Sequence, residues 1–182
     1  MHFKFNVNLT DEDYLNFNSF TMLNTPQGKL SVKNLRVMIA LIFFLIGVFV
    51  LITRDYSPNV QVLFFVLISA WFILLQLLLK KMLKHSWKRQ LIKMKKAGKS
   101  VYTPESEICF YDDVFVETTP CEKNELKYSV IEDVSVVGEN AIYIYVSALK
   151  AYILPFSCFE SKEQWDDFAT FIKTKCDKVT II

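Results

Sequence analysis

Two long runs without charged residues dominate the hydropathy pattern of the chain. The run "VMIALIFFLIGVFVLIT" separates Arg36 from Arg54, and a second uncharged run has its apolar core from Val60 to Leu79. As helices they would be about 26 Å and 30 Å long at about 1.5 Å per residue, and a bilayer core of about 30 Å needs roughly 17–25 residues. A helix that is apolar on every face must be enclosed, and a chain of 182 residues offers too little protein to enclose two. The pattern therefore predicts a hairpin of two membrane-spanning helices over residues 34–79.

The connection between the two runs, "RDYSPN", is short enough to make the helices antiparallel neighbours. Pro58 suits the first turn of the second helix. Tyr56 is placed where amphipathic aromatic rings favour a membrane interface. Small residues let helices approach closely in a bilayer, and those expected at the contact are Gly47, Ser69 and Ala70.

The second run leads directly into "KKMLKHSWKRQLIKMKKAGK", residues 80–99, which we call the basic segment. It holds nine lysines or arginines and no acidic residue. Cations beside an anionic leaflet contribute about 1 kcal/mol each, so an anionic lipid bilayer is their expected partner. The cations expected to contact lipid headgroups and to set the topology are Lys80, Lys81, Lys84, Lys88, Arg89, Lys93, Lys95 and Lys96.

Apolar residues of the basic segment recur at helical spacing. Leu83, Trp87, Leu91 and Met94 follow one another at i, i+4, i+8 and i+11 and form an interfacial stripe on one helix face. The segment therefore either lies along the bilayer surface or extends as a stalk to Gly98. The stripe would pack on lipid in the first arrangement and on the C-terminal domain in the second.

Basic residues are distributed unequally between the two ends of the hairpin. The connecting loop has only Arg54, which Asp55 offsets, whereas Lys29, Lys33, Arg36 and the basic segment lie at the other end. The positive-inside rule then places both termini in the cytosol. All four cysteines would lie on that side, which suits buried thiols in a reducing compartment.

Residues 100–182 carry 15 acidic and 7 basic residues and show short β-type patterns. Apolar and polar residues alternate in "SEICFYDDVFVETT", where Asp112-Asp113 indicates a tight turn. "ELKYSVIEDVSVVGENAIYIYV" predicts further strands around a turn at Gly138–Asn140, and "KAYILPF" predicts another that Pro155 ends. Several antiparallel strands are therefore expected.

The last predicted element is an amphipathic helix. Ser161 with Gln164 forms a capping-box pattern at its start. A core-facing stripe follows at helical spacing, made of Trp165, Phe168, Ala169, Ile172 and Cys176. Strands closed by such a helix predict a small barrel-like α+β domain over residues 100–182.

The N-terminal segment, residues 1–33, shows both periodicities. "FKFNVNL" alternates as a strand from Phe3 to Leu9, and Thr10 with Asp13 can cap a following amphipathic helix. This segment is too short to fold alone. We expect it to be cytosolic and to pack on the C-terminal domain.

These pieces in this order resemble the YcxB-like family of small bacterial membrane proteins. The resemblance rests on "FNVNLTDEDYLNF" ahead of the hairpin and on "SEICFYDD", "LKYSVIEDV" and "AYILPFSCF" after it. It implies a cytosolic domain similar to pleckstrin-homology (PH) domains, a bent antiparallel sheet closed by a C-terminal helix. The family supplies no catalytic residues. The chain departs from the family pattern at Tyr128, where tryptophan is common, and at Phe156-Ser157, where basic residues are common, which weakens the expectation of a headgroup site at that edge.

No constellation in the sequence predicts chemistry. A Gly-rich phosphate loop is absent, the two histidines are far apart, and no cysteines are spaced as C-x-x-C. Turn and helix-start roles explain two of the three acid pairs, Asp112-Asp113, Glu132-Asp133 and Asp166-Asp167. We therefore expect no catalytic, cofactor-binding or metal-ligating residue and no enzyme activity. Neither span contains an ionisable residue that would indicate transport, and the acidic C-terminal domain would repel nucleic acid.

Three functions remain open. The protein is a membrane-tethered interaction or regulatory module, a membrane immunity or stress protein that protects against a toxin or bacteriocin, or an accessory subunit of a membrane complex. Each implies another protein, or a second copy of the chain, as a partner. The sequence does not separate them.

Overall fold

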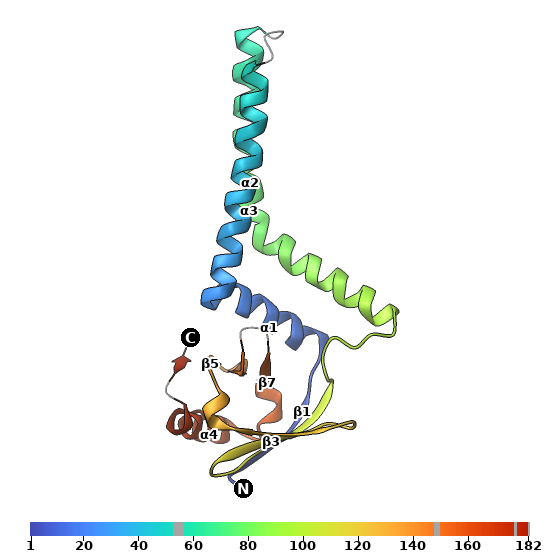
Figure 1. Ribbon diagram of the computed structural model, residues 1–182, viewed down its shortest axis with the longest axis vertical. Helices are drawn as coiled ribbons and strands as arrows, with labels where there is room; N and C mark the ends of the chain where they lie inside the picture. The colour runs from blue at the N-terminus through green and yellow to red at the C-terminus, as the bar shows by residue number, and fades with distance from the viewer. Residues whose placement is uncertain (53–56, 148–149, 177, 182) are drawn as a thin grey trace. The chain divides into compact units, whose positions relative to one another are not determined.

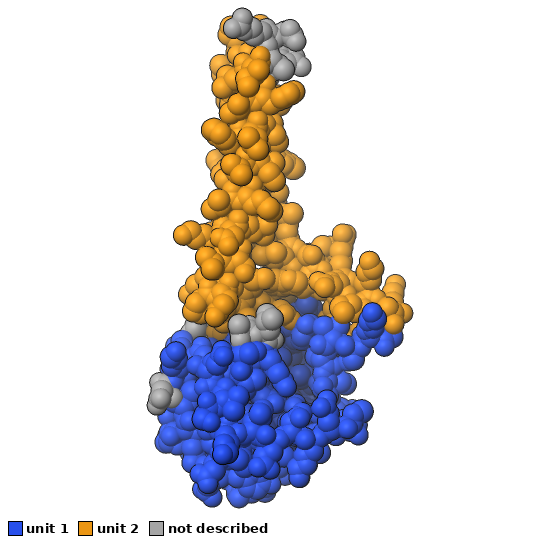
Figure 2. Space-filling view, in the orientation of Figure 1, with its two compact units in different colours: residues 1–17, 98–182 blue, residues 18–97 orange. Residues whose placement is uncertain are grey.

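The computed structural model of the chain describes residues 1–52, 57–147, 150–176 and 178–181 (Figure 1). The chain divides into two compact units, one made of residues 1–17 with 98–182 and the other of residues 18–97 (Figure 2). Helix α1, Asp11–Asn24, begins in the first unit and ends in the second. The expected loop charges Arg54 and Asp55 and the expected interfacial Tyr56 lie outside the described residues.

The second unit contains two long helices, α2 (Pro26–Ile52) and α3 (Pro58–Lys96), which run side by side (Figure 1). Their most apolar windows have mean hydropathies of 2.9 and 2.7, and only 11% and 6% of those windows are buried. A core helix of a soluble protein would be mostly buried instead. Both helices are long and apolar enough to cross a membrane. They extend beyond the expected hairpin, because α2 begins at Pro26 and α3 continues without interruption into the basic segment.

A tight elbow joins α1 to α2. The Thr25 hydroxyl donates to the carbonyl of Thr21 (2.7 Å) and accepts from the backbone N–H of Gly28 (3.1 Å), so that Thr25 caps α2. A Cβ on Gly28 would lie 2.2 Å from the Thr21 carbonyl oxygen and 2.6 Å from the Met22 Cα. Only glycine permits the two helices to approach this closely.

The described residues of the first unit form eight strands in two sheets. One sheet has the order β1-β2-β3-β4, all antiparallel: Phe3–Asn8, Glu105–Phe110, Val114–Thr118 and Lys123–Lys127. The other has the order β7-β6-β5-β8: Ala151–Pro155, Ala141–Tyr145, Asp133–Val137 and Val179–Ile181. The family resemblance implied one bent antiparallel sheet. The structure differs because a 3₁₀ turn at Tyr128–Val130 separates β4 from β5, and because β8 pairs with β5 in parallel.

Strand β1 completes the first sheet from the far end of the chain. It pairs with β2 over its whole length, from Phe3 opposite Phe110 to Asn8 opposite Glu105. The predicted N-terminal strand is therefore confirmed, and it packs with the C-terminal strands as expected. The segment that contains the hairpin is inserted in sequence between two paired strands.

Both predicted turns in this unit are present. The backbone N–H of Tyr111 donates to the carbonyl of Val114 (2.9 Å) across Asp112-Asp113. Gly138 has a φ of +47°, a left-handed conformation that an L side chain would strain, and it opens the turn between β5 and β6. These turns set the register of the strands on either side.

Helix α4, Lys162–Lys175, closes the core of the first unit. Ser161 accepts a hydrogen bond from the backbone N–H of Gln164 (3.3 Å), which confirms the predicted cap. The ring of Phe168 lies 4.9 Å from that of Phe5 and 4.7 Å from that of Phe110. The predicted stripe is confirmed over its buried members, which are Trp165, Phe168, Ala169 and Ile172.

The first half of α1 lies over the outer face of the second sheet. Thr10 and Asp13 exchange the predicted capping hydrogen bonds, from Thr10 N–H to the carboxylate (2.9 Å) and from Asp13 N–H to the hydroxyl (3.2 Å). The Phe17 ring then contacts Tyr143 of β6 at 5.2 Å. Strand β6 is buried on both faces for this reason.

Candidate functional site

The basic segment forms the last part of α3, and it ends where Gly98 adopts a φ of +70°. All eight cations predicted to contact lipid are solvent-exposed. Because α3 contains no acidic residue, its own helix supplies no carboxylate to neutralise them. In Figure 1 this part of α3 (green) diverges from α2.

The interfacial stripe is the covered side of the same segment. Leu91 is only 3% exposed, and Leu83, Trp87 and Met94 are half-buried, while the cations around them are exposed. The helical spacing read from the sequence therefore describes the segment as it is folded, with one apolar face and a cationic remainder.

Three more cations occupy the N-terminal part of α2. Lys29, Lys33 and Arg36 are all exposed. Because α2 and α3 are antiparallel, the start of α2 and the basic segment lie at the same end of the pair. The long helices thus carry a strong positive charge at one end.

A groove with a volume of about 420 Å³ runs between the apolar parts of α2 and α3. Its floor includes Gly47, where an added Cβ would lie 3.2 Å from the Phe65 ring. Of the small residues expected at the helix contact, Gly47 is buried, Ser69 lines the groove, and Ala70 is exposed outside it. The sequence did not predict a groove, because its existence depends on how the two helices are paired.

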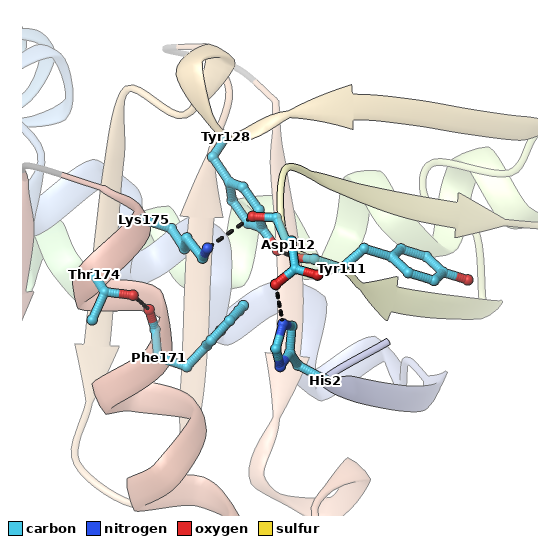
Figure 3. Close-up of polar contacts among 7 residues, drawn as sticks. All are labelled: His2, Tyr111, Asp112, Tyr128, Phe171, Thr174 and Lys175. Atoms are coloured by element: carbon cyan, nitrogen blue, oxygen red, sulfur yellow. Dashed lines mark hydrogen bonds and ion pairs between the residues drawn. The ribbon is translucent and has the colours of Figure 1, made fainter.

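A cluster of side chains at one end of the first unit, which we call the terminal cluster, joins four segments of the sequence (Figure 3). His2 Nε2 lies 2.6 Å from the Asp112 carboxylate in the β2–β3 turn. Lys175, at the end of α4, donates to the Asp112 carbonyl (2.8 Å) and lies over the Tyr128 ring, 5.6 Å from its centroid. The Tyr128 hydroxyl in turn donates to the carbonyl of Tyr111 (2.7 Å).

The contacts of the terminal cluster suit a structural role, because they connect the N-terminus, the β2–β3 turn and the end of α4. The hydrogen bond from His2 lowers the pKa of Asp112 and keeps it ionised. Burial raises the pKa of Tyr128 to about 12, and the charges of Asp112 and Asp113 add to this effect. The phenol therefore remains a neutral donor. The cluster could not be predicted from the sequence, because its histidine and aspartate lie 110 positions apart.

A half-buried carboxyl lies on the inner face of the first sheet. Glu117 of β3 is opposite Ile108 of β2 and Asn124 of β4. Burial raises the pKa of Glu117, while a hydrogen bond from Asn124 and the charge of Lys150 oppose that rise. The charged form is therefore disfavoured at this position.

The described residues contain no group of three or more histidines, cysteines, aspartates or glutamates that could hold a metal ion. The four cysteines are free thiols. Burial raises the pKa of Cys158 to about 12 and also raises that of Cys109. Both are thiols at neutral pH, and the thiolate is the reactive form of cysteine.

These observations define a class of protein: an α+β domain whose first sheet is interrupted in sequence by a hairpin of two helices long and apolar enough to cross a membrane. Residues 110–172 match the family model of YcxB-like protein, from the end of β2 through most of α4. The resemblance to the YcxB-like family seen in the sequence is therefore confirmed over these residues, about a third of the chain. No curated protein and no solved structure matches the chain.

Proposed function

We propose that this protein is a non-enzymatic, two-span integral membrane protein whose strand-rich unit is a membrane-tethered interaction or regulatory module. In this proposal both termini are cytosolic at a bacterial plasma (inner) membrane. The observation that carries it is the continuity of α3, which runs from an apolar helix into an exposed cationic one without a break. Such a helix has its apolar part in the hydrocarbon and its cations at the headgroups.

Electrostatics support an anionic leaflet as the first partner. Juxtamembrane cations contribute about 1 kcal/mol each near such a surface, and the eight exposed cations of α3 have no acidic neighbour in their own helix. Exposed charges are screened over about 8 Å at physiological ionic strength. The contact should therefore weaken as salt is added.

The PH-like assignment is part of the proposal. The family resemblance implied one bent antiparallel sheet closed by a C-terminal helix, and what supports the assignment here is one aromatic core shared by two sheets and closed by α4. A fold of this kind does not specify a ligand. The excess of acidic residues in residues 100–182 favours a protein partner with a basic surface over a phosphate-bearing one.

Reporters of membrane topology fused to each end of the chain test the anchor. We expect both ends of the wild type to be cytosolic, and neutralisation of five cations of α3 to produce mixed topologies. Those replaced by glutamine are Lys80, Lys81, Lys84, Lys88 and Arg89. A charge-matched control neutralises five exposed lysines of the other unit, Lys123, Lys127, Lys150, Lys162 and Lys173. If both ends of the neutralised protein stay cytosolic as in the control, the account of the basic segment is wrong.

Hydrogen exchange in nanodiscs tests the lipid contact directly. Amides of residues 80–96 should exchange more slowly in discs of phosphatidylglycerol than in discs of phosphatidylcholine. The difference should vanish in about 1 M salt, where charges are screened within about 3 Å. Equal exchange in both lipids at low salt would contradict the proposed contact.

Crosslinking in a mild detergent tests the interaction module. We expect the full chain to be captured with a second protein or a second copy of itself. Recovery of an uncrosslinked monomer at every crosslinker concentration would refute this part of the proposal.

A further inference from the structure

We propose that the groove between α2 and α3 is a binding site for one anionic phospholipid, with an acyl chain in the groove and the headgroup on the cations beyond it. The inference rests on the proposed membrane location and deepens it, because it replaces a general surface contact with a defined site. Three features of the second unit carry it.

The first feature is the shape of the groove. On α2 its lining extends from Ala40 to Leu51, which is about 16 Å at roughly 1.5 Å per residue. A volume of about 420 Å³ over that length leaves a mean cross-section of roughly 25 Å². A helix about 10 Å in diameter would need about 80 Å². The groove can therefore hold an extended hydrocarbon chain along its length but cannot enclose a whole helix from a second copy.

The second feature is the chemistry of the lining. Every residue of the groove is apolar except Ser69. The rings of Phe43 and Phe72 meet edge to face, 5.5 Å apart, and bridge the two helices. Phe44 and Ile73, 66% and 58% exposed, form the lips. An acyl chain between these two residues would contact both helices, which the apolar face of a single helix would not allow.

The third feature is the register of the charges with the groove. On α2, Arg36 and Lys33 precede Ala40 by four and seven residues, so they lie on its face of the helix. On α3, Lys80 follows Ile73 by seven residues and lies on the same face as the groove lining. The cations thus lie in line with the apolar groove, about 6–10 Å beyond its end at about 1.5 Å per residue.

One polar side chain lies between the groove and the cations. Gln76 follows Phe72 by four residues and is half-buried. Its amide can donate to an ester carbonyl of a phospholipid. From the groove outward, the two helices therefore present an apolar region, then an amide, then positive charge, which is the order of acyl chain, ester and phosphate in a phospholipid.

Native mass spectrometry of the full-length protein from mild detergent tests the site, with dioleoyl phosphatidylglycerol and dioleoyl phosphatidylcholine as probes. We expect one phosphatidylglycerol to be retained, at least tenfold more than phosphatidylcholine. Ser69→Leu fills the groove and should reduce retention at least tenfold. Ala70→Leu adds the same side chain one position outside the groove and should leave retention unchanged.

A second pair of variants tests the cations at the charged end of the site. Arg36→Gln with Lys80→Gln should reduce the retention of phosphatidylglycerol to that of phosphatidylcholine. Lys123→Gln with Lys127→Gln removes two exposed cations of the other unit and should preserve retention. Ser69→Ala, which leaves the groove open, should bind as the wild type does and would show that Ser69→Leu acts through its added volume and not through loss of the hydroxyl.

Equal retention by Ser69→Leu and Ala70→Leu would overturn the inference. So would a lipid-free wild-type dimer that Ser69→Leu converts to a monomer, since the groove would then contact a second copy. Either result can occur with normal topology and normal exchange in the basic segment. A failure of the lipid site is therefore distinguishable from a failure of the proposed function.

Discussion

Removal of the hairpin should leave a stable domain only if β1 is kept. Strands β1 and β2 are adjacent and antiparallel, and the backbone N–H of Leu9 donates to the carbonyl of Pro104 (2.8 Å) beyond the last strand pair. Replacing residues 10–103 with Asn-Gly would join the two strands by a two-residue turn of the type that hairpins prefer. The comparison is between this fusion and a fragment of residues 104–182 that lacks β1.

The side chains of β1 set the size of the effect. Phe5 and Val7 are 1% and 3% exposed, and full burial of such a side chain is worth about 1.5–3 kcal/mol. The two together contribute about 3–6 kcal/mol, a large part of the roughly 5–15 kcal/mol by which domains are stable. We expect the fragment to be unfolded and the fusion to be folded. Phe5→Ala in the fusion should lower its free energy of unfolding by about 3–5 kcal/mol.

Trp165 provides the assay. It is the only tryptophan left in either protein and is 3% exposed, so its fluorescence reports unfolding in urea. The fusion also lacks Phe17, which covers Tyr143, so it should be less stable than the same unit in the full chain. If the fragment without β1 unfolds cooperatively at the same urea concentration as the fusion, β1 is dispensable and the reasoning fails.

Three further substitutions test local features. Gly28→Ala should open the elbow between α1 and α2, because the new Cβ would lie 2.2 Å from a carbonyl oxygen; limited proteolysis in mild detergent should cut there several-fold faster, and an unchanged rate would refute the steric argument. Burial raises the pKa of Glu117, so its stabilising contribution is complete below its unfolded value of 4.5 and is lost as the pH rises through the higher folded value. Glu117→Gln should therefore raise the melting temperature at pH 7 and leave it nearly unchanged at pH 4, and an equal shift at both pH values would contradict this. Lys175→Met keeps the aliphatic stem over the Tyr128 ring but removes the hydrogen bond to the Asp112 carbonyl and the cation–π contact, which should lower the free energy of unfolding in urea by about 1 kcal/mol. Because the hydrogen bond uses the backbone carbonyl, Asp112→Gly should reduce this effect only if it displaces that carbonyl. Wild-type stability of Lys175→Met would show that these contacts of the terminal cluster are dispensable.

Elements with strong local signals were predictable from the sequence. The caps at Thr10 and Ser161, the turn at Asp112-Asp113 and the buried stripe of α4 each depend on residues a few positions apart. The long helices were predictable because their composition alone sets their length and environment. The exposure of the cations of α3 follows from the same helical spacing.

Features that depend on distant contacts were not predictable. Strand β8 has three residues and pairs with β5 in parallel, so its partner, not its own sequence, defines it. The need for glycine at position 28 arises from the approach of two helices. The alignment of Arg36 and Lys80 with a groove could be seen only once the contact between α2 and α3 was known.

The pairing of β1 with β2 also has a consequence for biosynthesis. Residues 9–104 separate the two strands, and at about 5–20 residues per second the ribosome needs roughly 5–20 seconds to make them. During that interval the apolar strand Phe3–Asn8 has no partner, and the hairpin emerges before its partner does. The strand-rich unit therefore completes its first sheet only after both long helices have been synthesised.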